Sequence, residues 1–448
     1  MKRWLLSAAV LLALGAVGYR LSRKSSYGPK PGLDPSPFRI ESVGQGTAIT
    51  FQPGDIPLRT RAWTRPLPGG AALMQVLSQS GRQQVFLFDQ GRLSDSLVLE
   101  CPQGVPAKAF AFAELSDAAW VPGKMLLLLY HTSQPDSPSL LLQWDITRHA
   151  LLGSYQGTGS RVVLSPTGTV AYLVDPNGPI QRLRLTGKSG GGLSAASVTR
   201  IALPEGISGV SDVLPENDAD LLMAWPGGLA AYHAGTWALQ PSPAPSLLGF
   251  PAGQGSLART GTRFWWQPEP GRLQEVSPDG RPLAEEDLGP LLSGAHGKDA
   301  QLLKLLGSDA QGHLWFSPES PTFRPVPPPS PQIQAPAPAA PPMIPSDAAA
   351  SVAAPAQPAS VPITPTPEDA WKPYLAAGLA RLYRWAPGQV SMKTYDWTQL
   401  WPHLGAPADL HPPDGDGGLV PAAGGLLLAG ETQHWWLPLS ALDAAQPR

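Results

Sequence analysis

Two short runs of carboxylates are the strongest candidates for acid–base chemistry in this sequence. They are PENDAD (215–220) and AEED (284–287). Two carboxylates held close together can divide the roles of general acid and general base. Both runs have the polar composition of loops, where solvated charge is the ordinary explanation. We predict a loop position for each run, and these are the first places to look if paired carboxylates act.

Two further motifs resemble ligand-binding loops but lack essential residues. LTGKSGGG (185–192) contains Gly187-Lys188-Ser189, but Arg182 stands where a phosphate-binding loop needs a glycine, and three glycines follow where its helix would begin. HPPDGDGG (411–418) has two aspartates at calcium-loop spacing, but glycines replace the third oxygen ligand and the bidentate glutamate. We interpret the first as a flexible loop and the second as a solvated turn.

The histidines and the single cysteine show no arrangement that indicates a catalytic or metal site. The histidines are His131, His149, His233, His296, His313, His403, His411 and His434. They lack the paired helical spacing of metal ligands, and no nucleophile elbow of the Gly-x-Ser-x-Gly type occurs. Cys101 has no cysteine partner within the chain, so we interpret it as a buried apolar residue. The sequence therefore predicts no catalytic, cofactor-binding or metal-binding residues, and no cofactor.

The overall composition favours an all-β fold. Charged residues make up 15% of the 448 residues, while Pro (54) and Gly (47) are abundant. Such a composition is typical of a turn-rich protein rather than a helical one. The net charge of -2 comes without long runs of like charge. This pattern excludes the basic surface that nucleic-acid binding requires.

The N-terminus has the features of a membrane-directed segment. An uncharged apolar run, residues 4–19, lies between basic residues on both sides (Lys2 and Arg3, then Arg20, Arg23 and Lys24). Its 16 residues are slightly short for a spanning helix, and Leu21 with snorkelling arginines can extend it. We predict that residues 1–24 form an uncleaved signal anchor. A signal peptide cleaved before Tyr19, after Ala16 and Gly18, is the alternative.

A repeated hairpin pattern begins at Phe38, after a polar spacer (25–37). Apolar runs alternate with short turns, and pairs of runs flank eight turn segments: 80–82, 134–139, 175–178, 226–228, 268–271, 310–312, 386–388 and 430–432. Once residues 325–367 are removed, the hairpins recur about every 40 to 55 residues, which is the spacing of four-stranded propeller blades.

Two segments resemble known β-propeller repeats. Trp144-Asp145, ITRH, ALLGSY and RVVLSPTGTVAYLVD are similar to a degenerate WD-type or YVTN-type repeat, although the preceding Gly-His dipeptide and a second Trp-Asp are missing. SDAQGHLWFSPES (308–320) is similar to blade strands of streptogramin-lyase-like propellers. The resemblance implies a propeller fold. The lyase activity would require a His and Glu constellation with a divalent metal, and no residue here matches it.

The pattern predicts how the ring is built and closed. Adjacent aromatics at 264–266, 315–316 and 435–436 are expected to pack between blades. Residues 38–324 and 368–448 divide into a seven- or eight-bladed propeller, and we favour eight. The strand that ends at 49–51, or the strand before it, is expected to pair with GLLLAG (425–430) and close the ring.

The Pro/Ala-rich segment 325–367 is predicted to be a disordered insertion between two blades. The sequence that follows, TPEDAWKPYLAAGLARLYRW (366–385), begins with a helix-start signature and has helical apolar spacing. Residues 368–448 could then be a separate small domain. Because Pro373 opposes a long helix, we favour the interpretation that 368–448 complete the propeller, with a short helix before the final blade or blades.

Two functions fit these features. The first is a non-enzymatic, single-pass inner-membrane scaffold whose periplasmic propeller binds envelope or inner-membrane proteins. The second is an enzyme or small-ligand binder, for a saccharide or with a metal, whose site lies at the mouth of the propeller channel. We favour the scaffold.

Overall fold

The described part of the chain consists mainly of antiparallel strands, as the alternation of apolar runs and turns predicts. The computed structural model describes residues 38–51, 62–67, 71–77, 83–99, 110, 113–121, 124–131, 138–185, 193, 198–241, 248–249, 257–292, 300, 303–309, 311–318, 322–323, 381–407, 419–422, 424–429 and 433–445. β8 (Met125–His131) illustrates why strands form here: its sequence MLLLLYH is almost wholly apolar, and all but its last residue are buried. A strand in the middle of a packed sheet is buried on both faces in this way.

The described residues form seven sheets of four or five strands, here called blades 1 to 7, and one two-stranded sheet. From the centre outward, blade 1 contains β3 (Ala62–Leu67), β4 (Ala71–Leu77), β5 (Gln83–Asp89) and β6 (Arg92–Leu99), and blade 2 contains β7 (Glu114–Val121), β8, β9 (Ser139–Asp145) and β10 (Ala150–Gly157). Blade 3 contains β11 (Arg161–Leu164), β12 (Val170–Val174), β13 (Ile180–Arg184) and β14 (Val198–Ile201), and blade 4 contains β15 (Asp212–Pro215), β16 (Leu221–Trp225), β17 (Gly228–His233) and β18 (Thr236–Pro241).

The remaining blades complete the set. Blade 5 contains β20 (Leu257–Thr260), β21 (Arg263–Glu269), β22 (Arg272–Val276) and β23 (Pro282–Asp287), and blade 6 contains β24 (Leu303–Ser308), β25 (Leu314–Pro318), β27 (Arg381–Trp385) and β28 (Lys393–Asp396). Blade 7 contains β29 (Leu419–Ala422), β30 (Gly425–Ala429), β31 (Gln433–Pro438), β2 (Gly46–Phe51) and β1 (Phe38–Val43). The described helices are α3 (Leu288–Leu291), α5 (Trp397–Leu404) and α6 (Leu439–Ala444).

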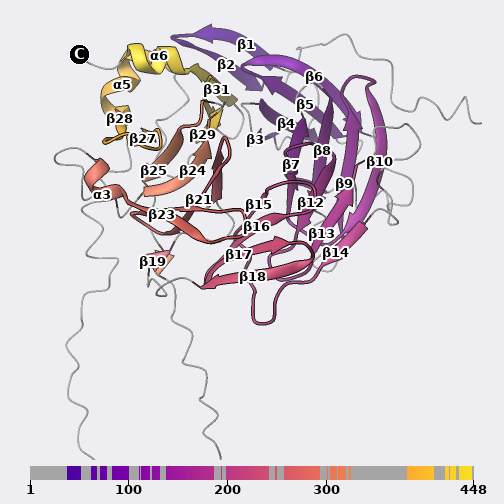
Figure 1. Cartoon of the computed structure of the whole chain (residues 1–448). Helices are drawn as coiled ribbons and strands as arrows, with labels where there is room; N and C mark the ends of the chain where they lie inside the picture. Colours follow the sequence, from indigo (N-terminus) through magenta and orange to yellow (C-terminus); the bar gives the residue numbers. More distant parts are fainter. Residues whose placement is uncertain are drawn as a thin grey trace, which may run out of the picture.

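The blades follow one another around a ring (Figure 1). The innermost strands of neighbouring blades contact one another, from β3 with β7 around to β24 with β29. In blades 1 to 6 the four strands follow chain order from the centre outward, so the turns between the first and second and between the third and fourth strands lie on one face of the ring, the hairpin face. In blade 7 the turns between β29 and β30 and between β1 and β2 lie on this face. The turns between second and third strands, together with the links from blade to blade, lie on the opposite face, the linker face.

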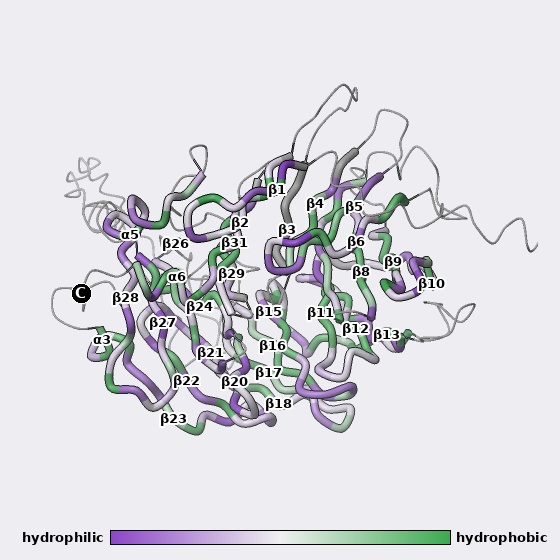
Figure 2. The backbone as a smooth tube through the Cα atoms, turned by 90° about the horizontal axis from the view of Figure 1, so that it is seen from above, coloured by the Kyte–Doolittle hydropathy of each residue, from purple (hydrophilic) through white to green (hydrophobic). Residues whose placement is uncertain are grey.

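Apolar side chains of neighbouring blades pack against one another to form the core, and Figure 2 shows the hydrophobic colour concentrated along the strands. The aromatic pairs predicted to pack between blades are buried there. Trp265 belongs to a cluster between blades 5 and 6, whereas Trp315 and Trp435 belong to one between blades 6 and 7 that also contains residues of α5 and α6. The packing role expected from their spacing is therefore confirmed.

Polar side chains also join the blades near the centre of the ring. Asp117 on β7 accepts a hydrogen bond from the backbone N of Val162 in the next blade over 2.8 Å. Arg161 donates to the Ser211 carbonyl (2.8 Å) and to Asp212 Oδ1 (3.0 Å) on β15. Asp212 Oδ2 in turn accepts from the backbone N of Leu257, over 3.0 Å. These contacts connect blades 2, 3, 4 and 5 without interruption.

The count of eight blades is wrong: the ring has seven. The hairpins around 310–312 and 386–388 belong to one blade, because β25 pairs with β27 (Leu314 with Trp385). Residues 325–367 thus lie between the second and third strands of blade 6, and not between two blades as predicted. The same pairing makes residues 381–396 part of the propeller rather than of a separate domain, and Leu382 lies in a strand.

The ring closes through the N-terminal strands, as expected, but with a different partner. β2 pairs with β31, so that Ile49 lies opposite His434, and β31 separates β2 from the predicted partner β30. β1 then forms the outer edge of blade 7. The prediction identified the correct blade and missed by one strand, because β30 is the apolar central strand and β31 also carries a histidine and a glutamine.

A two-stranded sheet joins the chain that follows β25 to the link between blades 4 and 5. In it, β26 (Thr322–Phe323) pairs with β19 (Leu248–Gly249), which lies between blades 4 and 5. The predicted membrane segment within residues 1–24 lies outside the described residues. Among the residues that are described, no helix is long and apolar enough to cross a membrane.

Candidate functional site

The carboxylates of PENDAD lie in the turn between β15 and β16, on the hairpin face, as the sequence predicts. The backbone N of Glu216 donates to the Asp220 carbonyl over 3.0 Å, which joins the two ends of the turn. Asn217 Oδ1 accepts from the backbone N atoms of Ala219 (2.7 Å) and Asp220 (3.0 Å). Asparagine commonly closes turns through such bonds, and here they hold both acidic residues in place.

His233 lies beside these carboxylates. It ends β17, whose residue Tyr232 is the register partner of Leu221, directly after Asp220. His233 Nδ1 lies 3.1 Å from Asp220 Oδ2, and the backbone N of Ala234 donates to Asp220 Oδ1 over 3.2 Å. Two turns of one blade thus meet. Glu216, Asp220 and His233 each offer an atom able to bind a metal ion, and these atoms lie within 4.8 Å of one another.

The sequence indicated the carboxylates of this cluster but not its histidine. Spacing rules search for ligands on one helix or one loop, whereas His233 follows Asp220 by a whole strand, a turn and a second strand. The hairpin repeat was the feature of the sequence that could have placed His233 beside the carboxylates. Turns that follow the first and third strands of one blade share a face, so residues 216–220 and 233–236 are neighbours.

The two carboxylates of the cluster, Glu216 and Asp220, have pKa values shifted in opposite directions. Burial raises the pKa of Glu216, and the nearby Asp220 carboxylate raises it further. Burial also acts to raise the pKa of Asp220, but hydrogen bonds from Asn217 and the Ala234 backbone, with the adjacent His233, bring it below its ordinary value. Asp220 is therefore the more strongly ionised of the two.

Blade 3 fixes the same turn from the other side. Thr167 donates to Asp218 Oδ1 over 2.5 Å, and Thr169 donates to Asp218 Oδ2 over 2.6 Å. These bonds outweigh the effect of burial and lower the pKa of Asp218. The turn therefore carries charge on a rigid support rather than on a free loop.

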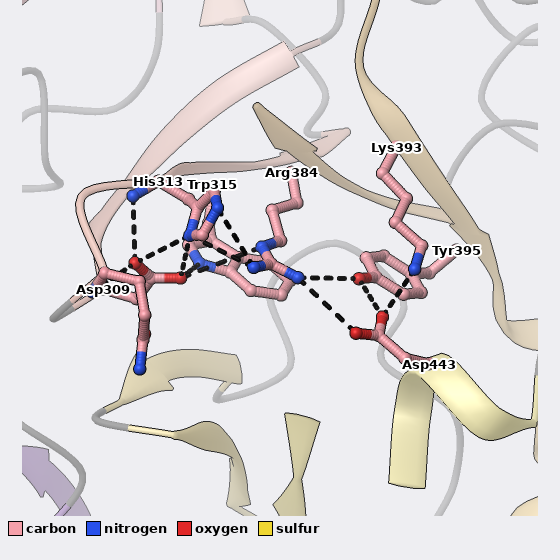
Figure 3. A network of polar contacts seen from close by, with 8 residues as sticks. Asp309, His313, Trp315, Arg384, Lys393, Tyr395 and Asp443 are labelled. Atoms are coloured by element: carbon pink, nitrogen blue, oxygen red, sulfur yellow. Dashed lines mark hydrogen bonds and ion pairs between the residues drawn. The ribbon is translucent and has the colours of Figure 1, made fainter. Parts of the chain in front are cut away.

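A second polar network lies between blades 6 and 7 (Figure 3). Asp309 is almost completely buried, and its carboxylate accepts from the indole Nε1 of Trp315 over 2.9 Å. The same carboxylate lies 3.0 Å from His313 Nδ1, and Arg384 Nη2 lies 3.1 Å from His313 Nε2. A His313 ring protonated on Nδ1 can make both contacts, donating to Asp309 and accepting from Arg384.

The other side of this network holds the last helix. Asp443 on α6 accepts from Lys393 Nζ and from the Tyr395 hydroxyl, each over 2.7 Å (Figure 3). Arg384 Nη1 lies 3.8 Å from Asp443 Oδ2, so this guanidinium links the two ends of the network. Because Arg384 contacts both His313 and Asp443, and Lys393 and Tyr395 donate to Asp443, the network joins α6 to blade 6.

The remaining predicted residues are dispersed. AEED lies on β23, an exposed outer strand, and not in a loop as predicted. An edge strand open to solvent on both faces can be polar throughout, which removes the alternation that identifies strands. Cys101, the Gly187-Lys188-Ser189 motif and the 411–418 motif lie outside the described residues, as do His296 and His411.

The other described histidines do not gather at one place. His131 lies within 3.5 Å of Ser139, and His149 Nδ1 lies 3.2 Å from Asp95 Oδ1. His403 is exposed on α5. His434 is fully buried on β31.

Comparisons with known proteins were made by sequence and by structure. No protein-family model and no curated protein matches the chain. Among solved structures, BamB from Moraxella catarrhalis matches with a TM-score of 0.30 and 12% identity over 65% of this chain and 94% of that one. The Dos1 propeller matches with a TM-score of 0.36 and 12% identity over 59% and 72% of the two chains, respectively. Hsv2 from Kluyveromyces lactis matches with a TM-score of 0.35 and 9% identity over 57% and 69%. The sheets of the chain itself show a seven-bladed β-propeller with degenerate repeats.

Proposed function

We propose that this chain is a non-enzymatic scaffold of the bacterial cell envelope, which holds a β-propeller at the inner membrane and binds other envelope proteins. Residues 4–19 cross the membrane once, and the propeller faces the periplasm. The basic, apolar and basic pattern of residues 1–24 supports the anchor. A ring of sheets joined by buried side chains supports the scaffold, because it offers a rigid surface for docking.

The observation that carries the proposal is where two chain segments join the ring. β1 runs parallel to β31, since both pair antiparallel with β2, and its first residue, Phe38, lies level with the start of β31 on the linker face. Pro318 ends β25 and Arg381 begins β27 on this same face. The strand ends that lead toward the predicted anchor and toward the Pro/Ala-rich segment therefore lie on the same face of the propeller.

This arrangement gives the scaffold a direction. With the anchor joined to Phe38 through the short spacer 25–37, the linker face lies toward the membrane and the hairpin face lies away from it. The hairpin face carries the acidic turn 216–220 and the exposed side chain of Val390. We expect periplasmic partners to dock on the hairpin face.

The test is crosslinking and pull-down of the full-length protein from its native membrane, beside a variant lacking residues 1–24. The proposal expects a discrete set of stoichiometric partners with the full-length protein and their loss, together with loss of membrane fractionation, in the truncated one. If neither protein retains a specific partner, the scaffold function is wrong.

A matched pair of crosslinking positions tests the direction. A photo-crosslinking residue in place of Val390 reports the hairpin face, and one in place of Glu205, exposed on the link between blades 3 and 4, reports the linker face. We expect partner adducts from position 390, and lipid or fewer protein adducts from position 205. Adducts with protein from position 205 alone would reverse the orientation.

A further inference from the structure

The cluster on blade 4 differs from an ordinary acidic turn because a histidine belongs to it. Glu216 and Asp220 come from the turn between β15 and β16, and His233 comes from the turn between β17 and β18. We propose that these three side chains bind a single divalent cation of the zinc class. An imidazole nitrogen with carboxylate oxygens is a donor set that Zn²⁺ accepts readily, whereas Ca²⁺ and Mg²⁺ prefer oxygen ligands alone.

The backbone places the donor atoms before any ion arrives. Asp220 is held by Asn217 Nδ2 at 3.0 Å and by the Ala234 backbone at 3.2 Å, and these contacts come from both turns. The antiparallel pairing of β16 with β17 fixes the spacing between the turns. The ion would therefore meet ligands that need little rearrangement, and the ordering cost of binding is correspondingly small.

The charges around the cluster favour a cation. Two carboxylates, those of Glu216 and Asp220, face a single imidazole, and the donor atoms of the three side chains lie within 4.8 Å of one another. The nearby Arg259 donates to backbone carbonyls, from Nη1 to Glu216 over 3.3 Å and from Nε to Gly261 over 2.9 Å. A bound divalent ion would neutralise the two adjacent carboxylates.

The coordination would be open on the solvent side. Three protein ligands leave at least one position for water or for a side chain of another molecule, since Zn²⁺ usually takes four ligands. His233 is mostly exposed, so the open position lies at the surface of the hairpin face. This distinguishes the site from a closed structural zinc site, whose loss would unfold the domain.

Isothermal titration of the full-length protein with Zn²⁺ alone tests the proposal. We expect His233→Ala and Glu216→Gln each to lose one equivalent of bound Zn²⁺, or to bind it at least tenfold more weakly. His149→Ala is the matched control: His149 also lies 3.2 Å from a carboxylate, that of Asp95, but belongs to no three-ligand group among the described residues, so zinc binding should not change.

A second measurement separates binding from folding. The melting temperature of metal-free His233→Ala should equal that of the metal-free wild type, and added Zn²⁺ should raise only that of the wild type. The Asp218→Asn variant, altered in the same turn but outside the ligand group, should still respond. If zinc binds wild type, His233→Ala and Glu216→Gln with equal stoichiometry and affinity, or does not bind at all, the assignment is wrong.

Discussion

Trp265 of blade 5 and Trp385 of blade 6 pack edge to face, with ring centroids 5.6 Å apart. The two residues are separated in sequence by the whole Pro/Ala-rich segment, yet both side chains are almost completely buried in one cluster. Through this contact β27, the strand that follows the segment, packs into the core between blades 5 and 6.

Replacing Trp385 should therefore destabilise the propeller as a core substitution does. We expect Trp385→Ala to lower the free energy of unfolding by about 3–5 kcal/mol, because it removes a buried ring and leaves a cavity. Urea denaturation followed by circular dichroism measures the loss. Val390→Ala, at a position that is 90% exposed in the following turn, is the control and should change stability by less than about 0.5 kcal/mol.

Removing residues 325–367 should leave the fold intact. β25 and β27 are paired neighbours, so their ends are already close, and a shorter connection costs little or even slightly favours folding. We expect the melting temperature of the deletion variant to lie within a few degrees of the wild type, and partner binding to be the property that changes. A fall in melting temperature as large as that of Trp385→Ala would contradict the prediction.

Stability should fall in acid because of His434. This residue is fully buried, and neither ring nitrogen has a hydrogen-bond partner among the described residues; its ring packs against Phe88 at 5.0 Å. Burial lowers the pKa of His434 from 6.5 to about 3. As the pH falls below 6.5, the unfolded chain takes up a proton that the folded chain rejects, so stability is lost progressively until about pH 3.

The size of this effect is the difference in acid dependence of stability between the wild type and His434→Leu. At pH 4.5 the histidine alone should cost about 3 kcal/mol relative to neutral pH. His434→Leu should lose that part of the acid dependence when unfolding is measured from pH 7 to 4.5, whereas replacement of the exposed His403 by Leu should not. Parallel curves for the wild type and His434→Leu would show that His434 does not titrate this way.

The central polar contacts should contribute to stability through Arg161. Burial acts to lower its pKa, but Asp212 and Asp117 raise it overall, so the guanidinium is charged and paired. Arg161→Met should cost about 3–5 kcal/mol because it removes the cation beside the buried carboxylate of Asp212 and the half-buried carboxylate of Asp117. Arg148→Met, whose guanidinium is half-exposed in a surface ion pair, should change the unfolding midpoint little.

Deleting residues 38–52 should unfold the domain. Without β2, the β31 edge of blade 7 is exposed, and buried residues such as Ile49 no longer cover His434. We expect the deletion variant to aggregate or to lose its cooperative thermal transition, as measured by calorimetry. An unchanged melting temperature would show that the N-terminal strands do not close the ring.

The strands were predictable because turn residues and apolar runs are local signals. The number of blades was not predictable, because the Pro/Ala-rich segment 325–367 separates β25 from β27 in sequence and makes one blade look like two. β23 was missed for a different reason: its outward position leaves AEED exposed on both faces, so the usual alternation is absent. His233 was missed because its contact with Asp220 depends on strand pairing, which spacing along the chain does not report.

The position of Phe38 also has a mechanical consequence. A membrane anchor joined to Phe38 through residues 25–37 would pull along the axis of β1, and β1 is joined to β2 by six aligned residue pairs. A force in this direction shears all six pairs together instead of opening them one at a time. The closing blade would then bear tension between the membrane and any partner held on the far side of the ring.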